Sequence, residues 1–149
     1  MALNKWDLRY LRLARFWAAQ CSKDPSTKVG AVLVSADDKR EYLGYNGFPR
    51  GVNDDPVRYA DRELKYKLVV HAEINAVLKA GKDAVGANLY VYPLFSCSEC
   101  AKIVIQAGIA RIVAPRPAEE RWQSSYDTAL MLYKEAHVEV EFYEGDLDD

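Results

Sequence analysis

The chain has 149 residues, of which 50% are apolar and 28% are charged, a balance typical of a globular domain, and its formal net charge is −2. This length fits one domain with a core large enough to fold without disulfide or metal staples, so we expect a single domain over residues 1–149. The slight acidic excess argues against a general nucleic-acid binder. No apolar run approaches the length of a membrane span or secretory signal. We therefore expect a cytoplasmic protein without a membrane or nucleic-acid partner.

The N-terminal segment predicts a helix over Lys5–Cys21, because large apolar residues recur in it at spacings of three and four. The predicted buried face consists of Trp6, Tyr10, Leu13, Trp17 and Cys21. In this interpretation Trp6 and Trp17 are core residues, and Cys21 is a small buried apolar residue. Asp24-Pro25 lies beyond the helix end, since a residue before proline disfavours the helical region.

A β-hairpin is predicted next. The continuous apolar run Lys28–Ser35 is typical of a central strand covered on both faces. Ala36–Lys39 is the turn, and Glu41–Tyr45 is the returning strand. Asn46–Gly51 is a loop at a strand end, where ligand-binding groups often lie. The polar segment Val52–Lys67 is either a solvated loop with a helical turn or, because of its length, a lid, an interface or a regulatory site.

Helices and strands alternate in the rest of the chain. The expected elements are helices His71–Ala80, Cys97–Ala107 and Ser124–Ala136 and strands Ala87–Tyr92, Ala110–Ala114 and Val138–Tyr143. The last strand alternates apolar and acidic residues, as an edge strand with one wet face does, and we expect the acidic tail 145–149 to be disordered. The order predicts a three-layer α/β/α sandwich around a five-stranded mixed sheet. Its first two strands are antiparallel, and strands three, four and five are parallel.

Two short motifs, His71-Ala72-Glu73 and Ser96-Cys97-Ser98-Glu99-Cys100, predict a metal site. The whole chain contains only two His and three Cys, and a Cys-x-x-Cys in a reducing compartment indicates metal or redox chemistry before a disulfide. Cys97 and Cys100 lie about one turn apart at a helix start, which favours the thiolate form. His71 supplies a third ligand. Three protein ligands leave a position for water, as in catalytic zinc sites, so we expect one zinc ion per chain. His137 follows the last predicted helix, and we expect it to be a surface residue.

Glu73 follows His71 by two residues, so on a regular helix the two side chains do not share a face. We interpret Glu73 as a proton-transfer residue that does not bind the metal. Taken alone it is equally well explained as a solvated carboxylate near a helix N-terminus, and a Cys-x-x-Cys alone also fits a thioredoxin-like pair. Together the motifs match the known signature of zinc nucleobase deaminases, so the assignment is motif recognition supported by chemistry.

From about Ser22 to Val113 the chain resembles the cytidine and deoxycytidylate deaminase family, and most closely its deoxycytidylate (dCMP) deaminases. Besides the two motifs, the resemblance lies in Ser22–Pro25, Lys28–Val32, Gly44–Gly47, Glu99–Lys102 and Ile105–Ile109. The family usually has Pro before the first Cys, whereas this chain has Ser96. Proline at this position pre-organises the start of a helix, and serine can cap a helix by hydrogen bonding. We therefore interpret Ser96 as serving the same purpose as the proline, through a hydrogen bond.

The resemblance implies hydrolytic deamination of dCMP to dUMP and ammonia. It implies that His71, Cys97 and Cys100 hold zinc and that Glu73 moves protons from water to N3 and to the amino group. By the same resemblance Asn46 binds the sugar hydroxyl and the Ala72 backbone contacts the pyrimidine edge. The candidate phosphate ligands are Ser26, Lys28 and Arg121, with Arg50 and Lys23 as weaker ones.

Regulation and assembly follow only from the resemblance. The family's nucleotide deaminases are often hexamers, activated by dCTP and inhibited by dTTP, so we expect a homo-oligomer (hexamer or dimer) with effector binding at Asn46–Asp61 and Mg²⁺ accompanying the effector. One alternative is a related zinc deaminase acting on cytidine, deoxycytidine, a modified dCMP or a tRNA base. Another is a non-catalytic zinc- or effector-binding module on the same fold. The acidic charge argues against the tRNA base, and the intact Glu73 argues against the non-catalytic module.

Overall fold

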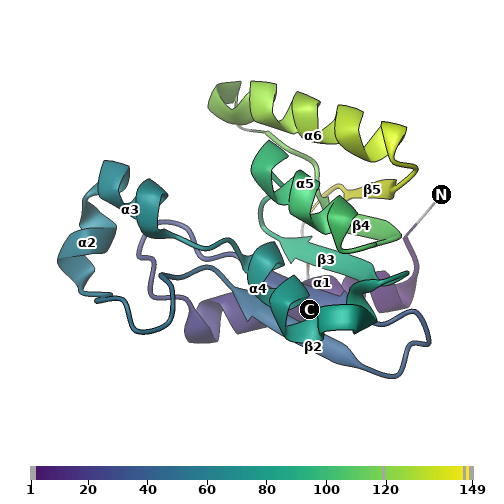
Figure 1. Ribbon diagram of the computed structural model, residues 1–149, viewed down its shortest axis with the longest axis horizontal. Helices are drawn as coiled ribbons and strands as arrows, with labels where there is room; N and C mark the ends of the chain where they lie inside the picture. Colours follow the sequence, from purple (N-terminus) through teal and green to yellow (C-terminus); the bar gives the residue numbers. More distant parts are fainter. Residues whose placement is uncertain (1–2, 119, 146, 148–149) are drawn as a thin grey trace.

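The computed structural model describes residues 3–118, 120–145 and 147. They form a five-stranded sheet with helices on both faces (Figure 1). The strands are β1 (Gly30–Val34), β2 (Glu41–Tyr45), β3 (Asn88–Tyr92), β4 (Arg111–Pro115) and β5 (Glu139–Tyr143). The helices are α1 (Lys5–Cys21), α2 (Pro56–Ala60), α3 (Arg62–Leu68), α4 (Ala72–Ala80), α5 (Ser98–Gln106) and α6 (Gln123–Glu135), with short 3-10 helices η1 (Gly81–Ala84) and η2 (Glu120–Trp122). Within the described residues, no helix is long and apolar enough to cross a bilayer.

The sheet has the strand order β2-β1-β3-β4-β5. Strand β1 pairs antiparallel with β2 and with β3, whereas β3, β4 and β5 run parallel. This arrangement confirms the predicted mixed sheet, with its antiparallel hairpin and parallel C-terminal strands. All five residues of β1 are buried, as its unbroken apolar run indicates.

Two apolar cores lie on opposite faces of the sheet. Helix α1 covers one face, α4 and α5 cover the other, and α6 packs on α5 (Figure 1). Because successive strand residues point to opposite faces, Ala31 and Leu33 enter the core beneath α4 and α5. Val32 and Val34 enter the core beneath α1. Alternate residues of the central strand β1 therefore contribute to the two cores of the three-layer sandwich.

The buried face of α1 differs from the prediction. Trp6 is 53% exposed, and Trp17 and Cys21 are only half-buried. The buried residues of the helix are Asp7, Leu11, Ala14 and Ala18. The helix approaches the sheet so closely that a Cβ atom placed on Gly30 would lie 2.0 Å from the Ala14 carbonyl oxygen. Only small side chains fit at this contact, so the large apolar residues lie to its sides.

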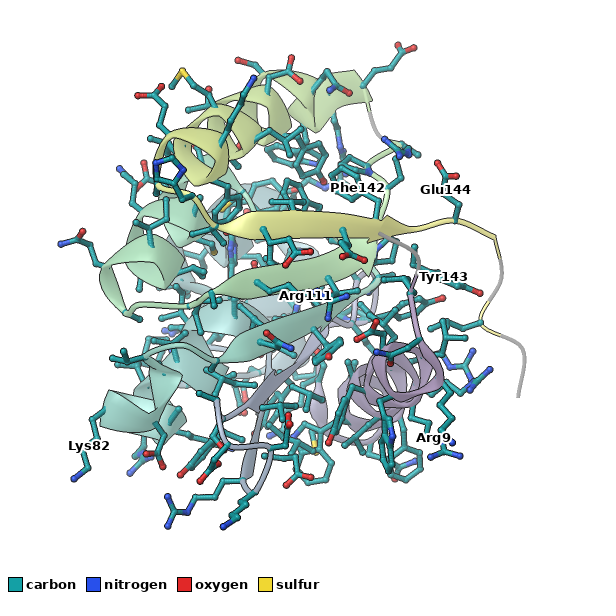
Figure 2. The ribbon with its side chains drawn as sticks, turned by 90° about the vertical axis from the view of Figure 1, so that its right-hand side faces the viewer. Arg9, Lys82, Arg111, Phe142, Tyr143 and Glu144 are labelled. Atoms are coloured by element: carbon teal, nitrogen blue, oxygen red, sulfur yellow. The ribbon has the colours of Figure 1, made fainter. Side chains whose placement is uncertain are left out.

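A buried charge cluster joins α1 to the far strands of the sheet. The Arg111 guanidinium (Figure 2) donates to the two carboxylate oxygens of Asp7 at 2.9 and 3.0 Å. It also lies 3.1 Å from a carboxylate oxygen of Glu141 on β5. The Tyr90 hydroxyl donates to Asp7 at 2.8 Å. Glu141 is consequently buried, so the wet face predicted for β5 is wrong at this position.

The polar segment between β2 and α4 folds into α2 and α3, which project from the body of the molecule (Figure 1). It is not a solvated loop, because Tyr59 and Lys65 are buried. The ring of Phe48 stacks on Tyr59 with 4.1 Å between the ring centroids. The segment therefore has a packed structure of its own beside the sheet.

The C-terminal residues that the structure describes are partly ordered by α1. Leu147 is buried in the core beneath α1, and Arg15 donates a hydrogen bond to its carbonyl oxygen. The disorder expected for residues 145–149 is thus wrong at Leu147, and the expectation for residues 146, 148 and 149 lies outside the described residues. His137 is exposed, as predicted.

Candidate active site

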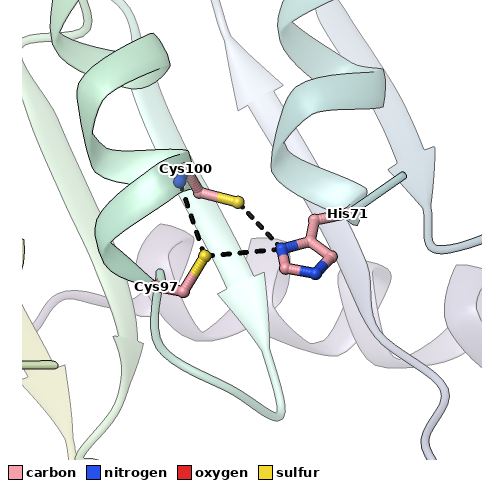
Figure 3. A group of neighbouring side chains, drawn as sticks. All are labelled: His71, Cys97 and Cys100. Carbon is pink, nitrogen blue, oxygen red and sulfur yellow. Dashed lines mark hydrogen bonds between the residues drawn. The ribbon is translucent and has the colours of Figure 1, made fainter. Parts of the chain in front are cut away.

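His71, Cys97 and Cys100 meet at the N-termini of α4 and α5 (Figure 3). His71 is the N-cap residue of α4, Cys97 is the N-cap residue of α5, and Cys100 lies in the first turn of α5. The Nδ1 atom of His71 lies 3.0 Å from Cys100 Sγ and 3.6 Å from Cys97 Sγ. Nitrogen and sulfur ligands of one tetrahedral zinc ion are about 3.6 Å apart. The three side chains therefore fit a zinc ion without rearrangement of the fold.

Hydrogen bonds within this group favour one thiolate. The hydrogen bond from Cys100, helped by His71, lowers the pKa of Cys97 to about 4 against the effect of burial. The same hydrogen bond and burial raise the pKa of Cys100, while the hydrogen bond to Cys97 raises the pKa of His71 to about 8. A metal ligand must be deprotonated. Cys97 is thus already in the form that binds metal, whereas Cys100 and His71 would each have to lose a proton to bind zinc.

Glu73 lies buried beside the three ligands. It belongs to the first turn of α4, is 4% exposed and lines the same cavity as His71 and Cys97. Burial raises the pKa of its carboxyl group above the ordinary value, and His71 opposes this shift. A general acid or base works best when its pKa is near the operating pH. The burial therefore suits proton transfer beside zinc, which when bound lowers the pKa of a water molecule toward about 7.

A cavity of about 170 Å³ lies in front of these groups. Its apolar wall includes Val29, Leu94, Phe95 and Trp122. Asn46, Ala72 and Arg121, which the sequence singled out, also line it. The cavity thus combines an apolar wall with a few convergent polar groups, as small-molecule sites do.

Comparisons with known proteins agree with this geometry. Residues 4–115 match the family model described as the cytidine and deoxycytidylate deaminase zinc-binding region. The chain belongs to this family. It is 42% identical over 142 residues to the deoxycytidylate deaminase of Mus musculus, a match covering 90% of this chain and 77% of that protein. It is 36% identical over 141 residues to an uncharacterized deaminase of Aliivibrio fischeri, a match covering 93% of both chains.

A solved structure of a dCMP deaminase has the same fold. The dCMP deaminase from cyanophage S-TIM5, in complex with dCMP and dUMP, aligns with a TM-score of 0.69 at 25% sequence identity. The alignment covers 96% of this chain and 100% of that chain. The family's zinc-binding region contains His71, Cys97 and Cys100 of this deaminase, which confirms zinc as its cofactor.

Asn46 of this deaminase lines the cavity but is largely occupied by its own loop. Its Oδ1 accepts hydrogen bonds from the Ser22 hydroxyl at 2.8 Å and from the Val29 backbone N–H at 2.9 Å. Its Nδ2 donates to the Thr27 carbonyl oxygen at 2.9 Å. An amide has two N–H donors, and these contacts use one of them. Asn46 therefore fixes the loop before β1, and these three contacts leave its second N–H unused.

Ser26 and Lys28 do not lie in the described lining of the cavity. The Ser26 hydroxyl donates to Asp24 at 3.0 Å, and the Lys28 ammonium donates to the Ser22 carbonyl oxygen. The weaker candidates also lie elsewhere: Arg50 is exposed, and Lys23 pairs with Asp54 at 2.6 Å. Of the proposed phosphate ligands, Arg121 lines the cavity, with its guanidinium 5.2 Å from the centroid of the Trp122 ring.

Lys65 also lines the cavity, although the sequence does not predict it as a site residue. Its ammonium lies 3.1 Å from Asp24 Oδ2 and donates to the Ser26 hydroxyl at 3.1 Å. Asp24 also accepts hydrogen bonds from the Ser26 and Thr27 backbone N–H groups. Lys65 and Asp24 are 41 positions apart, and no local pattern in the polar segment marks Lys65 as buried.

Ser96 does not cap α5, contrary to the interpretation above. The N-cap residue is Cys97, whose Sγ accepts a hydrogen bond from the Cys100 backbone N–H at 3.4 Å. Ser96 is fully buried, and its hydroxyl forms a hydrogen bond with the Tyr133 hydroxyl.

Proposed function

We propose that this protein catalyses the zinc-dependent hydrolytic deamination of dCMP to dUMP and ammonia. The observation that carries the proposal is the His71, Cys97 and Cys100 group in the wall of a cavity that also holds the buried Glu73. The substrate is supported by the mouse relative named deoxycytidylate deaminase and by the cyanophage enzyme in complex with dCMP and dUMP.

The residues divide the reaction between them. His71, Cys97 and Cys100 hold zinc, which supplies Lewis-acid activation of water. Glu73 accepts a proton from the water that attacks C4 and delivers it to N3. It then takes the second proton of that water from the hydroxyl group on C4 and passes it to the amino group, which leaves as ammonia while C4 becomes a carbonyl carbon. The buried Ala72 backbone lines the cavity at the helix start, where it contacts the edge of the pyrimidine.

The sugar and the phosphate extend toward the outer part of the cavity. We assign the sugar hydroxyl to the remaining N–H donor of Asn46. We assign the phosphate to Arg121 in place of Ser26 and Lys28, because Arg121 lines the cavity and a guanidinium can bind phosphate in a bidentate manner. Lys65 adds a hydrogen-bond donor there, but Asp24 balances its charge.

An ammonia-release assay on purified protein tests the proposal, with deoxycytidine as the matched control because it differs from dCMP only in the phosphate. Charge-assisted hydrogen bonds contribute about 1.5–3 kcal/mol, so kcat/KM should be about 10–100-fold higher for dCMP than for deoxycytidine. Equal turnover of the two compounds would exclude phosphate recognition and favour a nucleoside deaminase. Release of ammonia from adenosine-containing RNA, and from none of the other substrates, would favour a tRNA-base deaminase. Failure to deaminate any of these substrates while zinc remains bound would favour a non-catalytic module.

We further propose that the protein acts in the cytoplasm as a homo-oligomer, a hexamer or a dimer, regulated by dCTP and dTTP. The thiol ligands are suited to a reducing compartment. Exposed apolar side chains on the outer helices, Leu78, Ile103 and Met131, support a contact between subunits. Effector binding is assigned to the segment 46–61, with Mg²⁺ bound to the effector phosphates. Sedimentation of the purified protein tests assembly. Titration with dCTP and dTTP, with and without Mg²⁺, tests regulation.

A further inference from the structure

Helix α6 contacts the residues on both sides of Cys97. Before Cys97, the hydroxyl oxygens of Ser96 and Tyr133 lie 2.7 Å apart, and both residues are 0% exposed. After Cys97, the Ser98 backbone N–H donates to the Ser125 hydroxyl at 2.9 Å. Tyr133 and Ser125 both belong to α6, which packs along α5 (Figure 1).

Cys97 depends on these contacts more than Cys100 does. Cys100 lies within α5, between helical residues on both sides, and its backbone N–H donates to Cys97 Sγ at 3.4 Å. Cys97 is the N-cap residue with extended backbone angles, φ −76° and ψ 170°, and only its carbonyl oxygen takes part in the helical ladder, accepting from Ala101 at 2.9 Å. Its N-terminal side continues directly into Ser96.

The hydrogen bonds form a short chain that ends on Cys97 itself. The Ser96 hydroxyl donates a weak hydrogen bond to the Cys97 carbonyl oxygen at 3.4 Å. Because a hydroxyl has one proton to donate, the Ser96 oxygen accepts the hydrogen bond from the Tyr133 hydroxyl. The ring of Tyr133 is held in turn by Phe95, with 6.0 Å between the ring centroids. A rigid and fully buried side chain of α6 is thus connected to the backbone of a zinc ligand.

We propose that Tyr133, through Ser96 and with the help of Ser125, is a positioning residue that holds Cys97 where it binds zinc. The inference rests on zinc binding by the site in the proposed function. Residues that orient metal ligands from outside typically contribute 10–100-fold to metal affinity. We therefore expect Tyr133→Phe to weaken zinc binding by about tenfold.

A positioning role and a purely structural role predict different results. Tyr133→Phe leaves the buried Ser96 hydroxyl without its strong partner, which destabilises the fold in either case. Replacing both partners by apolar groups of similar shape is nearly neutral for stability. The double variant Ser96→Ala/Tyr133→Phe should therefore recover thermal stability, but it still lacks the connection to Cys97 and should still bind zinc weakly.

Tyr90→Phe is the matched control. It removes another buried tyrosine hydroxyl that donates a hydrogen bond, at 2.8 Å to Asp7, on the opposite face of the sheet under α1. It should lower the stability of the fold and leave zinc affinity unchanged.

The experiment measures zinc affinity by competition with a chromophoric chelator and thermal unfolding of the metal-free proteins. The proposal is supported if the single Tyr133 variant and the double variant both release zinc to the chelator about tenfold more readily than wild type and Tyr90→Phe does not. It is overturned if the double variant binds zinc as wild type does, or if Tyr90→Phe weakens zinc binding equally. Wild-type protein that binds no zinc would instead overturn the proposed function.

Discussion

Replacing Glu73 by Gln should abolish deamination while leaving zinc in place. Glutamine has nearly the same volume as glutamate and fits a site where the side chain is 4% exposed, but it cannot take up or deliver a proton. One general acid–base step is worth about 10²–10⁴-fold in rate. Because Glu73 acts on both the attacking water and the leaving amino group, we expect kcat to fall by at least about 10⁴-fold, equivalent to about 5 kcal/mol.

The same variant should not destabilise the metal-free protein. Burial raises the pKa of Glu73 in the folded state above its unfolded value of about 4.3, so its ionisation opposes folding as the pH rises above about 4.3. Glutamine has no charge to bury. Metal-free Glu73→Gln should therefore unfold at a higher temperature than wild type at pH 7, and this advantage should disappear toward pH 4.

Three measurements on one preparation check this reasoning: ammonia release from dCMP, bound zinc per chain, and thermal unfolding after metal removal. Glu63→Gln is the control, because Glu63 is an exposed glutamate in the first turn of α3 and should leave all three unchanged. Loss of zinc from Glu73→Gln would show that Glu73 is a ligand. Turnover within tenfold of wild type would show that another group moves the protons.

The remaining predictions concern the metal, the phosphate and the fold. Removing zinc with a chelator should abolish ammonia release and adding zinc alone should restore it; recovery with Mg²⁺ alone would contradict the assigned cofactor. Arg121→Gln should raise KM for dCMP about tenfold, the loss of one charge-assisted contact, and leave KM for deoxycytidine unchanged; equal changes would remove Arg121 from the phosphate site. Arg111→Met should lower the free energy of unfolding in urea by about 3–5 kcal/mol, because Asp7 and Glu141 would remain buried without their cation. Burial would raise the pKa of Asp7, but hydrogen bonds led by the one from Arg111 lower it. This stabilisation is therefore present above about pH 3.9 and lost as the pH falls through the folded-state pKa, so the variant and wild type should converge in acid.

The zinc ligands could be predicted because their chemistry is rare and their spacing is local. A Cys-x-x-Cys at a helix start places two thiols about one turn apart whatever surrounds it, and the structure places His71 Nδ1 within 3.6 Å of both. The strand pairing was predictable for a related reason. A tight turn joins antiparallel strands, while a helical crossover joins parallel ones, and the observed sheet follows both rules.

Features that depend on distant partners could not be predicted. The periodicity of α1 predicted that its large apolar residues are buried, but the buried side of the helix is set by the close approach of Ala14 to Gly30. The segment that contains Lys65 looks solvated because it is polar, yet Asp24 neutralises that lysine from 41 positions away. In each case the decisive partner lies on another element, and neither periodicity nor local charge contains that information.

Ser96 shows how a departure from a motif is compensated at another point of the chain. Proline before the first cysteine pre-organises a helix start through its fixed φ angle, and serine has no such constraint. Here the restraint comes from α6 instead, because Tyr133 is fully buried and its hydroxyl lies 2.7 Å from that of Ser96. A hydroxyl pair of this kind has a consequence that proline does not. The position of Cys97 becomes coupled to the packing of α6 against α5. Substitutions in the contact between α5 and α6 should therefore change zinc affinity, although they touch neither the metal ligands nor the cavity.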